Sequence, residues 1–360
     1  MSGNRRQNPK DPKFPLLQYP LPVRDMTIQC MSPMQLVNYS FSSKEAAQAV
    51  RQVRIQVDLM EIYLYGLRNR SSNPQNEQGI ELTFSGHSGE SVLFWFASTN
   101  SKDQVFHKKV TIDGYVLRKC YTKSYKDQKH LACFTQPNVL VTYLKKVEAH
   151  FRSVFRIQNT NVDLNGDLIS KYRNYGDLKK PMVVNNLRVN TEIEPGMEQK
   201  LRVFNPSYLQ LDLIRLPRRE LEITADVIEY GFQYGELNIL HLKDLDARQI
   251  EIISFVDEAV LRSYIGFWHR KDLEKLEVFK CAVTNRFDRA HFLNFFSAQR
   301  FDRVRRPATK KVIDGDGKEK EVDLSNGMDI LRADGRVATV HFDQNKNRIT
   351  HFWFVVWPKN

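Results

Sequence analysis

The segment Phe14–Val50 constrains the fold of this chain more than any other, because it predicts three short helices in close succession. After Pro20 and Pro22, apolar or small residues recur at helical spacing, which predicts a first helix with an apolar stripe. The stripe consists of Val23, Met26, Thr27, Cys30 and Met31. Because so small a unit cannot bury all its apolar surface alone, the segment indicates a docking module for a partner.

Start signals mark the second and third helices. Ser32-Pro33 combines an N-cap residue with proline at the first helical position, where the missing N–H costs nothing. Ser42 and Glu45 have the spacing of a capping box, which predicts that the third helix begins there. The second helix carries Leu36, Val37 and Tyr39, and the third is expected to turn Ala46, Ala47 and Val50 inward.

These residues resemble the F-box, the motif that joins substrate receptors to SCF (Skp–cullin–F-box) ubiquitin ligases. The family's Leu-Pro start, Asp/Ser-Pro step and Leu-Ser-x-x-Ser-Lys segment correspond to Tyr19-Pro20, Ser32-Pro33 and Ser40-x-x-Ser43-Lys44. Tyr19 and Tyr39 replace usual leucines and add hydroxyl groups that need water or a partner. The resemblance implies an F-box over residues 12–53 whose contacts with a Skp-family adaptor come from Pro20, Val23, Met26, Met31, Pro33 and Leu36. The alternative is an ordinary helical subdomain packed on its own chain.

Length and composition describe a globular protein. The 360 residues suit about two domains, and 41% hydrophobic with 27% charged residues is ordinary. The longest wholly apolar run, Phe352–Trp357, is too short for a membrane span. The start of the chain lacks the apolar core of a secretory signal, and residues 1–11 are expected to be disordered. Four scattered cysteines fit reduced thiols, so we expect a cytoplasmic or nuclear protein.

A net charge of +12 raises nucleic-acid binding as an alternative function. The densest basic cluster lies in residues 300–311, beside Phe295, Phe296 and Phe301. Leu293 and the phenylalanines have the helical spacing of a core face, which places the arginines on a solvated edge or loop. A protein partner is therefore favoured over a nucleic acid.

The rest of the chain divides into two regions by its periodicity. Residues 54–137 alternate apolar and polar residues and predict an antiparallel sheet, with a hairpin at Asp113-Gly114. Residues 138–360 begin with an amphipathic helix to Val154 and then predict alternating strands and helices. The expected strands are Leu187–Val189, Leu211–Leu213, Leu237–Ile239 and Leu276–Val278, and the expected helices are Ala247–Phe255 and Asp257–Trp268. Such units predict an irregular leucine-rich-repeat-like curve whose concave sheet suits another protein.

The C-terminal part carries a second resemblance. Met328–Val340 predicts two strands turning at Asp334-Gly335, and Thr350–Trp357 predicts a strand covered on both faces and ended by Pro358, which limits an exposed edge. These elements resemble the nematode-expanded F-box proteins that carry a type-2 F-box-associated domain. The matching segments are Leu261–Trp268, Leu273–Leu276, Asp329–Val340 and Phe352–Trp357. The resemblance implies that 138–360 is the associated region, most family-like over 205–300, with terminal strands in 326–357.

Motifs for chemistry are weak throughout. Gly86–Gly89 does not match a nucleophile elbow, and Asp314–Gly317 lacks the spacing of a calcium loop. His107, Cys120, His130 and Cys133 do not have standard zinc spacing. We therefore expect no catalytic residue, metal or cofactor. The expected fold class is α+β or α/β, and the expected role is a non-catalytic adaptor that binds a target protein and reaches a cullin and a RING protein through Skp.

Overall fold

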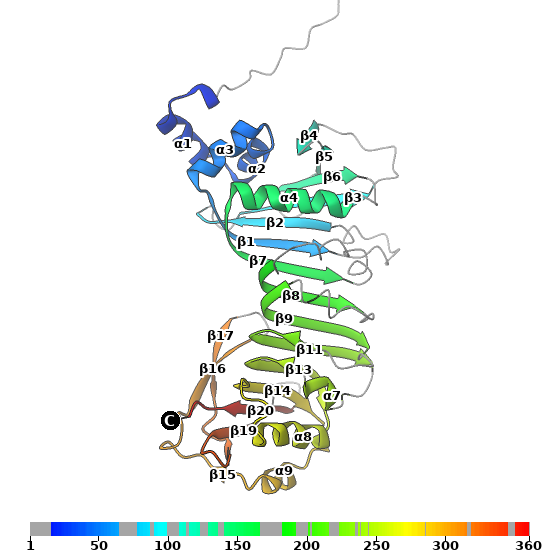
Figure 1. Cartoon of the computed structure of the whole chain (residues 1–360), viewed down its shortest axis with the longest axis vertical. Helices are drawn as coiled ribbons and strands as arrows, with labels where there is room; N and C mark the ends of the chain where they lie inside the picture. The colour runs from blue at the N-terminus through cyan, green and yellow to red at the C-terminus, as the bar shows by residue number, and fades with distance from the viewer. Residues whose placement is uncertain are drawn as a thin grey trace, which may run out of the picture. The chain divides into compact units, whose positions relative to one another are not determined.

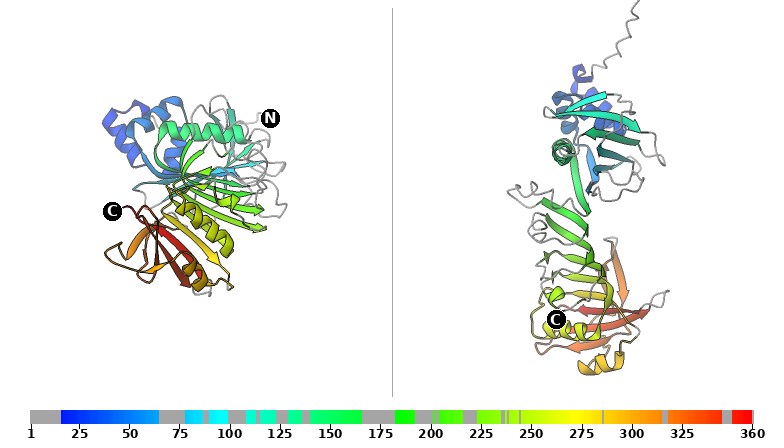
Figure 2. Two further views of the ribbon diagram at one scale, coloured as in Figure 1. Left: turned by 60° about the horizontal axis from the view of Figure 1, so that its bottom comes forward. Right: turned by 90° about the vertical axis from the view of Figure 1, so that its right-hand side faces the viewer.

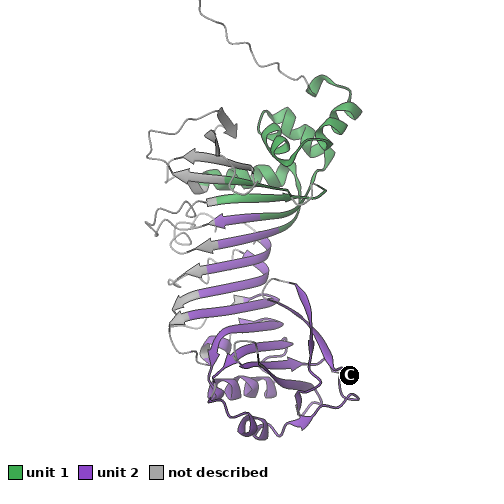
Figure 3. Cartoon of the chain, turned by 180° about the vertical axis from the view of Figure 1, so that it is seen from behind, with its two compact units in different colours: residues 1–60, 78–159 green, residues 61–77, 160–360 purple. Residues whose placement is uncertain are grey.

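A computed structural model gives the fold of the chain (Figure 1). It describes residues 16–64, 78–86, 90–98, 108–112, 115–122, 129–135, 140–165, 182–191, 201, 204–215, 223–234, 237, 239–243, 245–284, 286–314, 318–344 and 350–359. The chain divides into two compact units, shown in Figure 3: unit 1 is Met1–Met60 with Gln78–Asn159, and unit 2 is Glu61–Glu77 with Thr160–Asn360. The expected fold class is confirmed in coarse form, because short N-terminal helices precede a mixed sheet with few helices.

The three predicted N-terminal helices are present in unit 1. A 3₁₀ turn, η1 (Leu16–Gln18), precedes α1 (Leu21–Gln29), α2 (Pro33–Ser40) and α3 (Lys44–Val53). The predicted start of α2 is confirmed: the Gln35 backbone N–H donates to the Ser32 hydroxyl, and the Gln35 side chain accepts from the Ser32 N–H at 2.8 Å.

The predicted cap of α3 is wrong by one residue. Ser43 is the N-cap, and its hydroxyl accepts from the Ala46 N–H at 3.0 Å. Ser42 instead donates its hydroxyl to the Tyr39 carbonyl at 2.7 Å, at the end of α2. The two adjacent serines thus form hydrogen bonds with backbone groups at the end of α2 and at the start of α3. The spacing of a capping box alone does not show which serine caps which helix.

The sheet of unit 1 is mostly antiparallel. Its strands are β1 (Gln56–Leu64), β2 (Gln78–Phe84), β3 (Ser91–Ser98), β4 (Lys108–Ile112), β5 (Tyr115–Thr122) and β6 (Lys129–Thr135), in the order β1-β2-β3-β6-β5-β4. β4 and β5 pair antiparallel from Ile112 and Tyr115 onward, as the predicted hairpin requires; its turn residues lie outside the described residues. The sheet differs from the antiparallel prediction between β3 and β6, which are parallel.

The predicted amphipathic helix α4 (Leu140–Val154) covers β2 and β3 (Figure 1). Phe151 and Phe155 pack beneath it against Phe94 and Phe84, with ring centroids 6.0 and 5.4 Å apart. Phe41, which follows α2, joins this cluster 5.7 Å from Phe94. A shared aromatic core therefore joins the N-terminal helices to α4 and to the sheet of unit 1.

Unit 2 is built on successive parallel strands. They are β7 (Arg156–Asn165), β8 (Met182–Thr191), β9 (Phe204–Arg215), β11 (Val227–Tyr234), β13 (Gln249–Val256) and β14 (Val278–Val283). A short parallel pair, β10 (Ile223–Thr224) and β12 (Leu245–Asp246), lies before β11 and β13. Each of these six strands pairs with the one that follows it in this series, so their order in the sheet is their order in the sequence.

The predicted elements of this region are partly wrong. The strands at Leu187–Val189 and Leu211–Leu213 lie within β8 and β9, and helix α8 (Glu258–His269) begins after its N-cap Asp257 as predicted. Leu237 and Ile239 do not lie in a strand, and a short helix, α7 (Leu240–Lys243), follows them. The predicted helix Ala247–Phe255 is strand β13, because alternation of Ile250 and Ile252 with polar residues suits a half-buried strand.

Antiparallel strands complete unit 2. They are β15 (Gln299–Arg300), β18 (Met328–Leu331), β19 (Val337–Gln344) and β20 (Thr350–Val356); a separate hairpin comprises β16 (Thr309–Ile313) and β17 (Glu319–Asp323), and α9 (Arg289–Phe295) follows β14. β20 pairs with β14 on one side and with β19 on the other, so it is an interior strand of the sheet.

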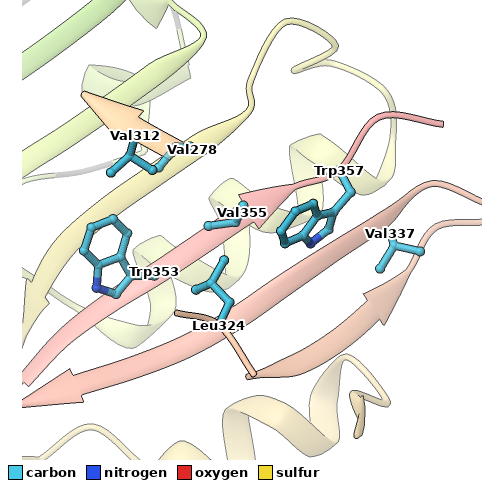
Figure 4. Close-up of a cluster of buried hydrophobic side chains, with 7 residues drawn as sticks. All are labelled: Val278, Val312, Leu324, Val337, Trp353, Val355 and Trp357. Atoms are coloured by element: carbon cyan, nitrogen blue, oxygen red, sulfur yellow. The ribbon is translucent and has the colours of Figure 1, made fainter. Parts of the chain in front are cut away.

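Both faces of β20 are covered, as predicted. On one face Phe352 and Phe354 meet Phe279 and Trp268, whose helix α8 runs along the strands in both views of Figure 2. On the other face lies a buried cluster that includes Val312 of the β16–β17 hairpin (Figure 4). The cluster consists of Val278, Val312, Leu324, Val337, Trp353, Val355 and Trp357.

The Arg-x-Asp-Gly turn ties β18 to α8. Arg332 is buried, and its guanidinium donates to the Trp268 carbonyl at 3.0 Å and to the Asp334 carboxylate at 2.8 Å. A cation at the C-terminus of α8 satisfies a free carbonyl and complements the helix dipole. Gly335 has a φ of +85°, which a residue with a side chain rarely adopts, so the Asp334-Gly335 turn has a structural reason.

Candidate docking surface on the N-terminal helices

The apolar stripe predicted for the first helix is exposed at Val23 and Met26, but Thr27 is half-buried, and Cys30 and Met31 lie beyond the end of α1. In α1, Leu21, Val23 and Met26 are 61%, 48% and 66% exposed. Leu17 and Tyr19, just before the helix, are also exposed. We call these five residues the α1 surface. Apolar residues that gather on one short segment and remain exposed are typical of an interaction site.

The opposite side of α1 attaches it to α3. Ile28 is fully buried, and Arg24 donates to the side chains of Asp25 and Gln52, the latter at 2.7 Å. Ala46, Ala49 and Val50 supply the buried face of α3. One face of α1 therefore packs within unit 1, and the other face exposes apolar side chains to solvent.

The six residues implied in adaptor contact lie in two different environments. Pro20, Val23 and Met26 are exposed, and Met31 is half-buried. Pro33 and Leu36 are buried, Leu36 completely. In this structure Pro33 and Leu36 support the helices from within and are not part of the α1 surface, whereas sequence analysis did not single out Leu17 and Leu21, which do belong to it.

The two tyrosines that depart from the F-box pattern also differ. Tyr19 lies on the α1 surface, where a phenol presents both an apolar ring and a polar tip. Tyr39 is half-buried, and its hydroxyl forms no hydrogen bond with any described residue. Burial raises the pKa of Tyr39, while the Arg24 guanidinium acts in the opposite direction. The Tyr39 substitution is therefore accommodated inside the helical module, away from its exposed face.

The α2 end of the module is tied to α4. The Ser40 hydroxyl lies 3.1 Å from Nε2 of His150, and the Phe41 ring stacks on His150 with centroids 4.4 Å apart. These contacts fix the end of α2 on α4, and α3 also packs against α4. They leave α1, which has one fully buried residue, as the outermost helix of the module.

The basic cluster at residues 300–311 is largely neutralised by carboxylates. Arg306 is buried against Asp329 at 2.7 Å, and Lys310 pairs with Glu277 at 3.2 Å. Lys311 pairs with Glu319 and Arg305 with Asp302, at 3.0 and 3.5 Å. Nucleic-acid binding rested on these cations. Because four of the six arginines and lysines have carboxylate partners, little free positive charge is left to attract a phosphate backbone.

The weak chemical motifs acquire no support. His107, His87–Gly89 and 315–317 lie outside the described residues, as do the side chains of Cys120, His130 and Cys133. Within the described ranges no three metal-ligating side chains gather into a site. In the same ranges no helix is long and apolar enough to cross a membrane.

Sequence analysis missed a row of polar side chains on one face of the parallel strands of unit 2. Arg188, Gln210, Glu229, Glu251 and Lys280 occupy successive register positions on β8, β9, β11, β13 and β14. Tyr208 donates its hydroxyl to Glu229, Arg188 donates to Gln210 at 2.7 Å, and Lys280 pairs with Glu251. In the sequence, each of these residues is only a polar residue between apolar ones in its own strand. That they form a row across the sheet follows from the register of the strands, which the sequence does not show.

Glu229 makes the stability of unit 2 depend on pH. Its residue is only 7% exposed, and burial raises the pKa of its carboxyl above the usual 4.5, with Glu251 and Asp212 raising it further. A raised folded-state pKa means that the folded chain holds the proton more tightly, so stability falls as pH rises from about 4.5 through the folded-state value.

Glu229→Gln keeps an acceptor for Tyr208 and removes this titration. We expect its melting temperature to exceed that of the parent chain at neutral pH, and the difference to shrink as the pH is lowered toward about 4. Thermal unfolding of both proteins across this range measures it. A constant difference at every pH would contradict the assignment.

Comparisons with models of protein families, with curated proteins and with solved structures found no match for this chain. The resemblance to the F-box therefore rests on the sequence motifs alone.

Proposed function

We propose that this chain is the substrate-recognition subunit of an SCF ubiquitin ligase, with the α1 surface binding a Skp-family adaptor. The observation that carries the proposal is the exposure of Leu21, Val23 and Met26 at the positions where the sequence resembles an F-box. An apolar helix face laid into a groove is a common mode of protein recognition. The buried side of the same helix supplies the rigid backing that such an anchor needs.

The part of the chain that follows the N-terminal helices, Arg54–Asn360, is proposed to bind the target protein. Its finer architecture, an irregular leucine-rich-repeat-like unit corresponding to a type-2 F-box-associated domain, is supported by the stacked parallel strands β7 to β14 and by the Arg-x-Asp-Gly turn. Catalysis is positional in this proposal. Tethering raises the concentration of target lysines near a charged ubiquitin-conjugating enzyme, held through the adaptor, a cullin and a RING protein.

The proposal is tested by mixing the purified full chain with a purified Skp-family adaptor and analysing the mixture by size-exclusion chromatography. We expect a one-to-one complex that elutes before either component. Isothermal titration then measures affinity. Separate elution at micromolar concentrations of both proteins would overturn the proposal, since an adaptor interface with apolar hot spots should bind more tightly than that.

A further inference from the structure

Strand β13 exposes two large apolar side chains on one face of the sheet of unit 2. Ile253 and Phe255 are 51% and 56% exposed, whereas Ile250, Ile252 and Val256 of the same strand are buried. Because successive side chains of a strand point to opposite faces of the sheet, the two exposed side chains share one face and the three buried ones share the other. Large apolar side chains that stay exposed next to each other are typical of an interaction site.

A carboxylate lies beside these apolar side chains. β9, β11 and β13 are neighbours in the sheet (Figure 1). A Cβ atom placed on Gly231 of β11 would be 3.6 Å from Cδ1 of Ile253 and 3.2 Å from Oδ1 of Asp212 on β9. Asp212 and Ile253 therefore approach each other across a position that has no side chain of its own. We call Asp212, Ile253 and Phe255 the β13 surface.

The Asp212 carboxylate has one oxygen that its neighbours do not use. Oδ2 accepts from the Gln210 side chain at 3.0 Å, whereas Oδ1 accepts from no described residue and is accessible to solvent. Arg188 is close enough to act on the Asp212 charge, but its guanidinium donates to Gln210 instead. Burial raises the pKa of Asp212, so a cation supplied from outside would stabilise the ionised form.

Two further carboxylates lie on the same face of the sheet. Glu229 of β11 accepts from the Tyr208 hydroxyl, and Glu251 of β13 pairs with Lys280. Asp212 and Glu251 both raise the pKa of Glu229, so the three carboxylates are close enough to repel one another. The chain as a whole carries a net charge of +12. A cationic partner is therefore attracted to this face and repelled by much of the remaining surface.

We propose that the β13 surface binds a basic segment of a partner protein, with the stem of an arginine or lysine on Ile253 and Phe255 and its charged head on Oδ1 of Asp212. These two side-chain types suit the surface because their hydrocarbon stems lie along apolar groups while the charged head stays solvated. An acidic segment would instead meet carboxylates of its own sign. The partner would be the target of the ubiquitin ligase, so this site rests on the proposed function and makes it more specific.

The site is tested with the full-length chain and no adaptor, so that adaptor binding and this site are measured separately. The probe is a fluorescein-labelled peptide of alternating arginine and leucine, Arg-Leu-Arg-Leu-Arg-Leu, followed by fluorescence anisotropy. We expect a Kd below about 1 mM. The matched peptide Glu-Leu-Glu-Leu-Glu-Leu should bind at least about tenfold more weakly. Non-specific attraction to a chain of net charge +12 predicts the opposite order.

Two variants remove the two parts of the site separately. Asp212→Asn keeps an acceptor for Gln210 and removes the charge, so the arginine peptide should bind about fivefold more weakly. I253S/F255S removes the apolar part and should weaken binding by about tenfold or more. V23D/M26D changes the α1 surface alone and should bind the peptide as the parent chain does.

Matched controls come from exposed residues elsewhere in unit 2. Asp226→Asn removes an exposed carboxylate that precedes β11, and Val304→Ser removes an apolar side chain that is 88% exposed. Both should bind the arginine peptide as the parent chain does, and thermal unfolding shows that each variant is folded.

Four results would overturn the proposal: no binding of the arginine peptide, equal or tighter binding of the glutamate peptide, loss of binding in V23D/M26D, or equal weakening in the controls and the site variants. Peptide binding by a chain that does not bind the adaptor would contradict the proposed function and leave the β13 surface as a binding site for basic segments.

Discussion

The double substitution V23D/M26D is expected to abolish capture of a Skp-family adaptor while leaving the fold of unit 1 intact. Both side chains are about half exposed or more, at 48% and 66%, so aspartates there remain solvated in the free chain. In the complex they would be buried without a partner. If each is a hot spot worth about 2 kcal/mol, the loss is about 4 kcal/mol, or roughly a thousandfold in affinity.

The variant is read out in two measurements. Titration calorimetry with purified adaptor gives the affinity, and thermal unfolding gives the stability, which should change by no more than about 0.5 kcal/mol for exposed positions. The matched control is V183D/V304D, which places aspartates at two exposed valines of unit 2, 72% and 88% exposed. Adaptor binding that survives V23D/M26D, or is lost equally in the control, would exclude the α1 surface as the interface.

Leu36 illustrates why the structure is needed to choose these positions. The resemblance to the F-box groups Leu36 with Val23 as residues that contact the adaptor. The structure separates them, since Leu36 is fully buried. Leu36→Asp would unfold the module and abolish adaptor capture for the wrong reason. Periodicity identifies a stripe on a helix, but whether that stripe meets the chain's own core or solvent depends on the neighbouring elements.

The same distinction accounts for most of what the sequence could and could not predict. Helix starts and turns are predictable from a few adjacent residues: Ser32-Pro33 begins α2, Asp257 begins α8, and Asp334-Gly335 turns between β18 and β19. These signals act within a few residues. The parallel pairing of β3 with β6 joins residues far apart in the chain, and nothing local encodes it. The segment of β13 is predicted as a helix because a short apolar run is compatible with both a helix and a strand.

The basic cluster near residue 306 shows the limit for charge. In sequence, Arg306 is one of several cations in a loop-like segment. In the fold, its guanidinium donates to Asp329 at 2.7 Å and to the carbonyls of Leu324 and Pro307, both at 2.9 Å, and lies over the rings of Phe301 and Trp357. The net charge of the chain includes Arg306 like any surface cation, but in the fold this side chain is buried in the core of unit 2.

Asp329→Ala is therefore expected to be among the most destabilising single changes in unit 2, at about 3–5 kcal/mol, because it leaves the Arg306 charge buried and unpaired. Both side chains of the pair are 0% exposed, and the same Asp329 oxygen accepts from the Thr339 hydroxyl at 2.9 Å. Thr339 in turn accepts from the Trp357 indole N–H at 2.8 Å. Loss of the carboxylate thus removes one end of a buried network. Urea unfolding followed by tryptophan fluorescence measures it.

Two further variants distinguish a buried charge from a lost contact. R306M/D329A removes both charges and keeps apolar bulk against Phe301 and Trp357, so it should recover much of the stability lost in Asp329→Ala. Glu319→Ala breaks the exposed pair with Lys311 and should cost less than about 1 kcal/mol. If R306M/D329A is no more stable than Asp329→Ala, the cost comes from the hydrogen bond to Thr339 and not from the unpaired guanidinium.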